Sequence, residues 1–343
     1  MGAVNAQPLS FYAKAIRPHL PESAFDAEPS RLVWLVVHVA IVVGGITALA
    51  HHVGGLIAAP LWSLLIGHSF GGLAFVGHET MHGAVVRNRV LRHLIGFVCF
   101  VPFLLSPRLW VAWHNKVHHG NTMIDGVDPD SFPTLADYKK SRALRVADYF
   151  SIGLGHWFGF MTLLIGFTGQ STQMLLRWSR HTDALDDRER KLVVMEALLA
   201  VSVWAVVAWV VGPLVFVFAF LIPLSVGNVV VMSYILTNHS LSPLTSINDP
   251  LLNSLSVEVP EVVHRLHLHF GLHVEHHLFP AMSSANAHLV RAELRKQFPD
   301  RYQSLPLIAA LRRLNGTPRV YATPTRLVDP RSGREADTLL PAS

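Results

Sequence analysis

The chain has 343 residues, a net charge of +5 and a mean hydropathy of +0.37, and only 15% of its residues are charged. Soluble domains usually carry about 25% charged residues, so this composition excludes an ordinary soluble globular protein. Cys99 is the single cysteine, which excludes an intrachain disulfide and a cysteine-ligated iron–sulfur cluster.

The N-terminal third begins with a polar lead, residues 1–30, that we expect to lie in the cytoplasm. This lead lacks the short apolar core and small-residue cleavage site of a signal peptide. Two runs without charged side chains follow, at 32–50 and 54–77. Each can cross a hydrocarbon core of roughly 30 Å, which takes about 20 helical residues. The sequence therefore predicts a hairpin of two transmembrane helices, at about 32–50 and 55–77.

A long loop, residues 78–191, follows this hairpin and is rich in Lys and Arg. Positive charge of this kind marks the cytoplasmic side of a membrane protein. Leu94 to Leu105 is apolar but too short to span, so it is typical of a re-entrant or interfacial helix. Tyr149 to Phe167 is rich in aromatic residues and glycine, and we expect an interfacial helix there, with a spanning pair formed with its neighbour as the alternative.

A second long apolar run, Val193 to Thr237, contains no charged residue and can hold two spans. Gly212-Pro213 near its middle is a turn signal, so we expect helices at about 192–211 and 214–236. Residues 238–310 should form a polar helical cap. The last segment, 311–343, is rich in Pro, Arg and Thr and is expected to be disordered.

These elements predict an all-α, multi-pass membrane protein. Its membrane domain, residues 31–310, has four transmembrane helices in two hairpins under a cytoplasmic cap. Both termini, the loop and the cap then face the cytoplasm. The basic charge is explained by this topology and by anionic lipid head groups. We expect no nucleic-acid partner, because the sequence holds no nucleic-acid fold motif.

Histidine is the most informative residue type, with 21 in the chain. Three clusters stand out, together with one histidine after the last apolar run: His78-Glu-Thr-Met-His82, His114-Asn-Lys-Val-His118-His119, His273-Val-Glu-His276-His277, and His239. On a helix, residues three or four apart share one face. His78 with His82, His114 with His118, and His273 with His276 can therefore converge on metal.

The doubled histidines, His118-His119 and His276-His277, point about 100° apart on a helix and can serve two different ions. Imidazole is a good ligand for iron, copper and zinc. The three clusters and His239 together offer nine imidazoles, which suits two ions better than one. All four elements are expected on the cytoplasmic side, so the sequence predicts a two-metal centre there.

The remaining histidines near the membrane are expected to have structural roles: His38, His51, His52, His68, His93 and His181. His264, His267 and His269 precede the third cluster, and we favour surface positions for them over contacts with the metal ligands. Residues that orient ligand rings are usual around a metal. The candidates for that role are Glu79, Asn121, Asp125, Asn238 and Glu275.

The three clusters with their flanks resemble the histidine boxes of membrane-bound fatty acid desaturases and the related membrane di-iron hydroxylases. The matching stretches are Gly77-His-Glu-Thr-Met-His82, Trp113-His-Asn-Lys-Val-His-His119 and Gly271-Leu-His-Val-Glu-His-His-Leu-Phe-Pro280, with Gly120 to Asp130 also similar. The resemblance covers about residues 30–300. It implies two iron ions, dioxygen as co-substrate and a lipid acyl chain that gains a double bond.

The same resemblance implies which residues bind iron: His78, His82, His114, His118, His119, His273, His276 and His277, with His239 matching a further family histidine. Each turnover consumes two external electrons. The His-Pro-Gly-Gly signature of a fused haem carrier is absent from the sequence. We therefore expect a separate donor, such as a ferredoxin with its flavoprotein reductase, on the basic cytoplasmic face.

Other functions remain open from the sequence. A hydroxylase, an acetylenase or an alkene-forming decarboxylase would use the same boxes. His78-Glu79-x-x-His82 also matches the zinc protease motif, in which Glu79 would be the general base. A metal transporter would instead place its histidines through the membrane interior, and here they gather at one face.

Overall fold

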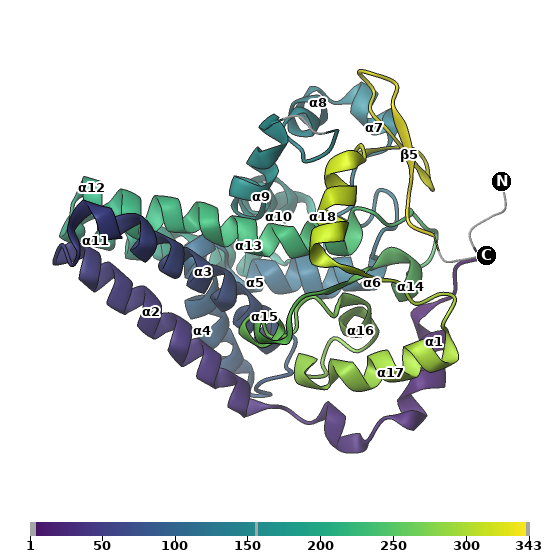
Figure 1. Cartoon of the computed structure of the whole chain (residues 1–343), viewed down its shortest axis with the longest axis horizontal. Coiled ribbons are helices and arrows are strands. Elements are labelled where there is room, and N and C mark those ends of the chain that lie inside the picture. Colours follow the sequence, from purple (N-terminus) through teal and green to yellow (C-terminus); the bar gives the residue numbers. More distant parts are fainter. Residues whose placement is uncertain (1–4, 155–156, 341–343) are drawn as a thin grey trace.

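The computed structural model describes residues 5–154 and 157–340, which are mostly helical with five short strands (Figure 1). Four helices of the described chain are long and apolar enough to cross a membrane: Pro29–Ala50, Gly55–Met81, Asp187–Val211 and Pro213–His239. They contain α2 (Leu32–Ala50), α3 (Gly55–Met81), α11 (Asp187–Val211), and α12 (Pro213–Phe216) with α13 (Ile222–His239). The four predicted spans are thus confirmed as helices.

Three of these helices extend beyond their predicted limits, because polar residues continue the helix. α3 runs four residues further and carries His78 and Glu79, and the last span continues to His239. α11 begins at Asp187 because Asp186 and Glu189 form a capping box. It ends at Gly212, whose φ of 80° is favourable for glycine but strained for other residues.

α3 lies at the centre of the bundle, between α2, α4 and α13 (Figure 1). Small residues let α3 and α13 approach closely. A Cβ atom on Gly67 would lie 2.5 Å from Cβ of Val226, and one on Gly71 would lie 2.7 Å from Cγ1 of Val230. Such glycine contacts are typical of helices packed within membranes.

The segment after α3 folds back on the bundle as two helices at an angle of 98°. The N-terminus of α4 (Arg89–Phe100) is capped by the side chain of Asn88, and a 3₁₀ turn Val101–Phe103 follows α4. α5 (Pro107–Trp110) then continues through a π-helix, Val111–His118, into α6 (His119–Asn121). The predicted short helix at 94–105 lies within this bent pair, which has the form of a broken span or a re-entrant loop.

The continuous helix expected over 149–167 is not what the structure shows. α7 (Leu135–Lys140) and α8 (Arg142–Tyr149) are followed by a turn, a 3₁₀ helix Trp157–Gly159 and α9 (Phe160–Gln173). Gly153 has a φ of 145°, which a helix does not allow. Residues 155 and 156 of the predicted helix lie outside the described residues. α9 packs along α13.

The cap lies at the opposite end of the bundle from the α2–α3 turn (Figure 1). It contains α14 (Pro250–Asn253), β1 (Ser256–Glu258), α15 (Glu261–Leu266), α16 (His273–Leu278), α17 (Ala287–Gln297), β2 (Ser304–Pro306) and α18 (Leu307–Gly316), with β1 parallel to β2. The N-terminal lead is part of this layer, because Tyr12 and Ile16 of α1 (Leu9–Ile16) share a buried core with Val274 and Leu294.

The C-terminal segment, expected to be disordered, is folded in this structure. After α18, strands β3 (Val320–Thr323), β4 (Arg326–Val328) and β5 (Glu335–Asp337) form an antiparallel sheet. Val320, Tyr321 and Leu327 are buried, and the Tyr321 hydroxyl donates to the carbonyl oxygen of Ser242. The correction has a physical reason, since composition counts the Pro, Arg and Thr residues but not the few apolar side chains that pack against Met123, Tyr138 and Leu244.

Candidate metal centre

Nine histidines from four separate stretches of chain converge where the spans meet the cap. They are the nine residues predicted from the sequence: His78, His82, His114, His118, His119, His239, His273, His276 and His277. Ring nitrogens of five of them, His78, His82, His114, His119 and His276, all lie within 4.8 Å of one another. We call these the five-histidine group.

The other four histidines, which include His118, form a second group next to the first. Ring nitrogens of His118, His239 and His277 lie within 4.8 Å of one another. Nε2 of His273 lies 2.8 Å from Nε2 of His239 and 3.1 Å from Nε2 of His277. We call these the four-histidine group.

The spacing of the ring nitrogens fits shared metal ions. In the five-histidine group, Nε2 of His114 lies 3.2 Å from Nε2 of both His78 and His119, and Nε2 of His119 lies 3.1 Å from that of His276. Two nitrogens bound at right angles to one ion at about 2.1 Å are about 3.0 Å apart. The donor set, all imidazole, suits iron, copper or zinc.

The histidines of the cap are also in the protonation state that a metal requires. Burial, reinforced by neighbouring histidines, lowers the pKa of His276 to about 3. Burial likewise holds the pKa of His273 and His277 well below the usual range. These rings are therefore neutral at physiological pH, and a neutral imidazole is a metal ligand.

The pairing of the boxes differs in part from the helical prediction. His78 and His82, one turn apart at the end of α3, are in one group as expected, whereas His114 and His118 are divided between the groups. The second box lies on a π-helix, where the backbone N–H of His119 donates to the carbonyl of His114, so the spacing of an α-helix does not apply. π-Helical turns are frequent at functional sites.

Hydrogen bonds hold the outer nitrogen of three rings in the four-histidine group. Nδ1 of His118 lies 3.0 Å from Oδ1 of Asp128, and Nδ1 of His239 lies 2.9 Å from the carbonyl oxygen of Asn253. Nδ1 of His277 lies 3.2 Å from Oγ1 of Thr122. When Nδ1–H donates to such an oxygen, Nε2 has no hydrogen and is free to bind metal.

These partners were missed by the sequence analysis. Asp128 and Asp130 belong to the Asp-Pro-Asp at the end of the stretch 120–130, which resembles the family pattern but does not by itself show which carboxylate meets a ring. Asp125, the carboxylate chosen there, is exposed. Asp128 is turned inward because its oxygens also accept from the backbone N–H of Met123 and Asp130.

The other proposed orienting residues have different roles. Glu79 accepts from Arg31, Ser283 and Ser284, and Glu275 accepts from Ser256, Arg291 and Tyr302. Both carboxylates thus hold box helices against the cap. The Asn121 amide donates to its own helix, and the buried Asn238 side chain has no hydrogen-bond partner among the described residues. Within that part of the chain none of these residues bonds to a ligand ring.

Several other histidines lie in places that differ from the surface positions expected. His264 and His267 are buried, because the segment after α15 folds down toward the helices. Nε2 of His267 lies 3.0 Å from Nε2 of His68 on α3. His51 and His52 are exposed at the turn between α2 and α3, at the other end of α3 from His78.

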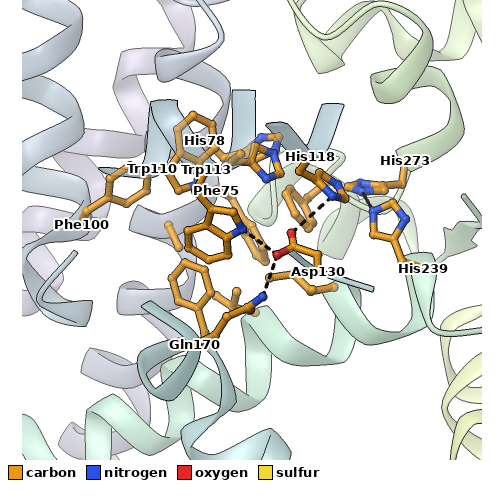
Figure 2. A pocket seen from close by; sticks show the side chains of 16 residues that line it. Phe75, His78, Phe100, Trp110, Trp113, His118, Asp130, Gln170, His239 and His273 are labelled. Carbon is orange, nitrogen blue, oxygen red and sulfur yellow. Dashed lines mark hydrogen bonds and ion pairs between the residues drawn. The ribbon is translucent and has the colours of Figure 1, made fainter. Parts of the chain in front are cut away.

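Two neighbouring cavities lie beside the histidines. The outer cavity, about 510 Å³, lies between α8, α9 and α13, and the inner cavity, about 40 Å³, is lined by aromatic rings and histidines. Asp130, Gln170, Ile235 and His239 line both cavities. Figure 2 shows Asp130 between Trp113, Gln170 and His118, with the indole N–H and the Gln170 amide donating to Oδ1 at 2.6 and 2.7 Å.

Four helices apolar enough to cross a membrane, beside nine converging histidines that could hold metal ions, are typical of one class, the membrane proteins with histidine clusters. Residues 54–307 match the model of one family in that class, described as fatty acid desaturase. The chain belongs to this fatty acid desaturase family.

Curated relatives agree with this family. The chain is 27% identical over 130 residues to the sn-1 acyl-lipid omega-3 desaturase (ferredoxin) of Synechocystis sp., covering 38% of this chain and 36% of that protein. It is 28% identical over 114 residues to the sn-2 acyl-lipid omega-3 desaturase (ferredoxin), chloroplastic, of Helianthus annuus, covering 33% and 26%. The chain thus spans about a third of the length of these relatives.

Proposed function

We propose that this protein desaturates a fatty acyl chain, using dioxygen, two iron ions and two external electrons. The observation that carries the proposal is the pair of histidine groups beside an apolar cavity. In the reaction a –CH₂–CH₂– unit, O₂, two electrons and two protons give –CH=CH– and two water molecules. When bound, the irons would supply the activation of dioxygen and the removal of hydrogen from unactivated carbon.

The residues would divide the ligands between the ions as the two groups do. His78, His82, His114, His119 and His276 would hold one iron, and the four-histidine group would hold the other. Asp128, Asn253 and Thr122 would keep the rings of His118, His239 and His277 in the metal-binding tautomer. Imidazoles on buried elements would give the irons fixed positions.

The protein's own contribution to the chemistry would be position and a dry site. An acyl chain in the outer cavity would pass Asp130 and Gln170 to reach the inner part. There Phe75, Trp110 and Trp113 would exclude water and fix one carbon pair beside the histidines. Neighbouring methylenes are alike in reactivity, so this placement would decide which carbons react.

Relatives on the same scaffold could hydroxylate, form an alkyne or decarboxylate, and the histidines alone do not decide among them. The names of the relatives favour desaturation, since each is a desaturase. The zinc protease alternative is disfavoured by Glu79. Its carboxylate is 6% exposed and is bound to Arg31, Ser283 and Ser284, so it is not available as a general base.

A separate reductant would supply the electrons, and the names of both relatives contain ferredoxin. Such a donor, reduced in turn by a flavoprotein, would dock on the basic face that carries the cap. The positive charge of the loop and cap would place this face, the centre and both termini in the cytoplasm. An acidic carrier would then be drawn to it electrostatically.

Expression in a host that lacks the activity tests the proposal. Mass spectrometry should find new unsaturated fatty acids with the wild-type chain and none with His276→Ala. His288→Ala is a matched control, because His288 is exposed on α17 and, among the described residues, its side chain hydrogen-bonds to the carbonyl of Ala285 alone, and it should keep the activity. Hydroxy acids or terminal alkenes in place of unsaturated acids would contradict desaturation, and unchanged lipids from a metal-loaded chain would contradict the whole proposal.

A further inference from the structure

A second polar cluster lies among the membrane-spanning helices, apart from the nine histidines. It consists of Tyr234 on α13, His267 from the segment after α15, His68 on α3 and His38 on α2. Tyr234 is 2% exposed and His38 is 1% exposed. Polar side chains within the apolar layer are costly and commonly functional, and the proposed desaturation makes no use of these.

The hydrogen bonds in this cluster have a definite direction. Oη of Tyr234 lies 2.8 Å from Nδ1 of His267, and no other acceptor of its hydrogen is found among the described residues. A buried hydroxyl donates where an acceptor is available, so Tyr234 donates to Nδ1. His267 then carries its hydrogen on Nε2 and donates to Nε2 of His68, at 3.0 Å. The Tyr234 phenol is thus hydrogen-bonded to one base, His267, which is in turn hydrogen-bonded to a second base, His68.

The Tyr234 ring is also close to both histidine groups. Its centroid is 5.9 Å from that of Phe270 and 5.5 Å from that of Phe75. The Phe270 centroid is in turn 4.8 Å from that of His78, in the five-histidine group, and 5.4 Å from that of His273, in the four-histidine group. A single ring therefore separates Tyr234 from either group, and Phe75 and Phe270 line the inner cavity.

We propose that Tyr234 is a redox-active residue that reduces the oxidised metal centre by one electron when dioxygen is consumed without an acyl chain. The inference rests on the proposed function. The phenol loses one electron to the centre, its O–H bond breaks, and the proton forms an N–H bond at Nδ1 of His267. The external reductant later returns an electron, and the proton goes back to the tyrosyl oxygen.

This step would protect the site. An oxidant without substrate would otherwise attack nearby imidazole and indole rings, such as those of His78 and Trp110. Loss of an electron makes a phenol strongly acidic, so oxidation is easiest where the proton has a base to go to. The bond from Tyr234 to His267 provides that base where both side chains are buried.

Freeze-quench electron paramagnetic resonance tests the proposal. The iron-loaded, reduced full chain, in detergent without acyl lipid, is mixed with dioxygen. We expect an organic radical whose spectrum narrows when the tyrosines are ring-deuterated. Tyr234→Phe should lose this signal. Tyr321→Phe should keep it, because Tyr321 is equally buried but donates only to the carbonyl of Ser242.

His267→Gln separates a base from a merely structural partner. Glutamine keeps a hydrogen-bond acceptor but cannot take the proton, so the radical should be lost while bound iron is retained. Tyr234→Phe should also accumulate oxidised Trp and His residues faster than wild type, as measured by peptide mass spectrometry.

Two negative results are distinguishable. Wild-type protein that binds iron and desaturates lipid but shows no tyrosyl signal, or a signal that Tyr234→Phe retains, would overturn the inference alone. Protein that binds no iron or forms no unsaturated product would overturn the proposed function, and the inference with it.

Discussion

At the scale of single residues, the site depends on the groups that hydrogen-bond to Nδ1 of the histidine rings. Asp128 carries this role for His118, with Nδ1 at 3.0 Å from its Oδ1. Loss of such a partner typically weakens metal binding by about 10- to 100-fold. We expect Asp128→Asn to weaken iron binding by about tenfold, because the charge that supports the ring is removed. Competition titration with an iron chelator measures the change in affinity.

Asp125→Asn is the matched control for this prediction, since Asp125 is in the same loop but exposed. It should bind iron as the wild type does. Equal weakening by both substitutions, or by neither, would mean that Asp128 does not support the ligand.

Glu79 supports the fold by joining α3 both to Arg31, which precedes α2, and to Ser283 and Ser284, which precede α17. Its Oε2 lies 3.1 Å from Nε of Arg31, and both side chains are buried. Breaking a buried pair of this kind costs about 3 kcal/mol. Glu79→Gln should therefore lower the temperature of thermal unfolding but keep bound iron and part of the activity. Complete loss of activity at unchanged stability and iron content would contradict this role and revive the protease alternative.

The sequence was most informative about the histidines that we propose as ligands. Spacing and family likeness predicted all nine histidines that converge. They did not identify Asp128, because choosing between it and Asp125 requires the path of the loop. Nor did they give the partners of His114 and His118, since nothing in residues 111–118 distinguishes a π-helix from an α-helix before the structure is known.

At the scale of elements, α9 forms one wall of the outer cavity. Gly169 on α9 lines this cavity, and a Cβ atom there would meet nothing within 4 Å. A larger side chain would thus occupy space rather than disturb the helix packing. We expect Gly169→Leu to lower kcat/KM for a long acyl chain by about tenfold, with bound iron unchanged. Product analysis with acyl chains of graded length measures the effect.

Gly44→Leu is the control for this element, because a Cβ atom on Gly44 of α2 also meets nothing within 4 Å, and Gly44 does not line the outer cavity. Its activity should match the wild type. An unaffected Gly169→Leu enzyme would contradict entry of the acyl chain through the outer cavity.

Elements differed in how far the sequence could predict them. The long charge-free runs predicted the four spans, because a helix that crosses a membrane is visible in the sequence as a continuous apolar run of about 20 residues. The sequence does not predict the C-terminal sheet, because strands of three residues such as β4 are too short to show the alternation of apolar and polar side chains. Its stability comes from burying Tyr321 and Leu327 against distant parts of the chain.

At the scale of the whole molecule, the fold joins distant stretches of chain at one end of the helices. His78 and His82 lie at the end of α3, His239 ends α13, and the other six come from the bent segment and the cap. α1 packs on α16 and α17 and thereby supports the third box. The sequence could predict that the boxes meet at one surface, but their division into groups of five and four depends on packing across the whole cap.

The central claim is that the nine histidines bind two iron ions in separate groups, and metal analysis tests it most directly. Purified wild-type protein should hold about two irons per chain, as expected for a two-metal site. His82→Ala removes a ligand from the five-histidine group and His239→Ala one from the four-histidine group. Each variant should keep about one iron. A wild type with a single zinc ion or no metal, or variants that keep both irons, would contradict the account.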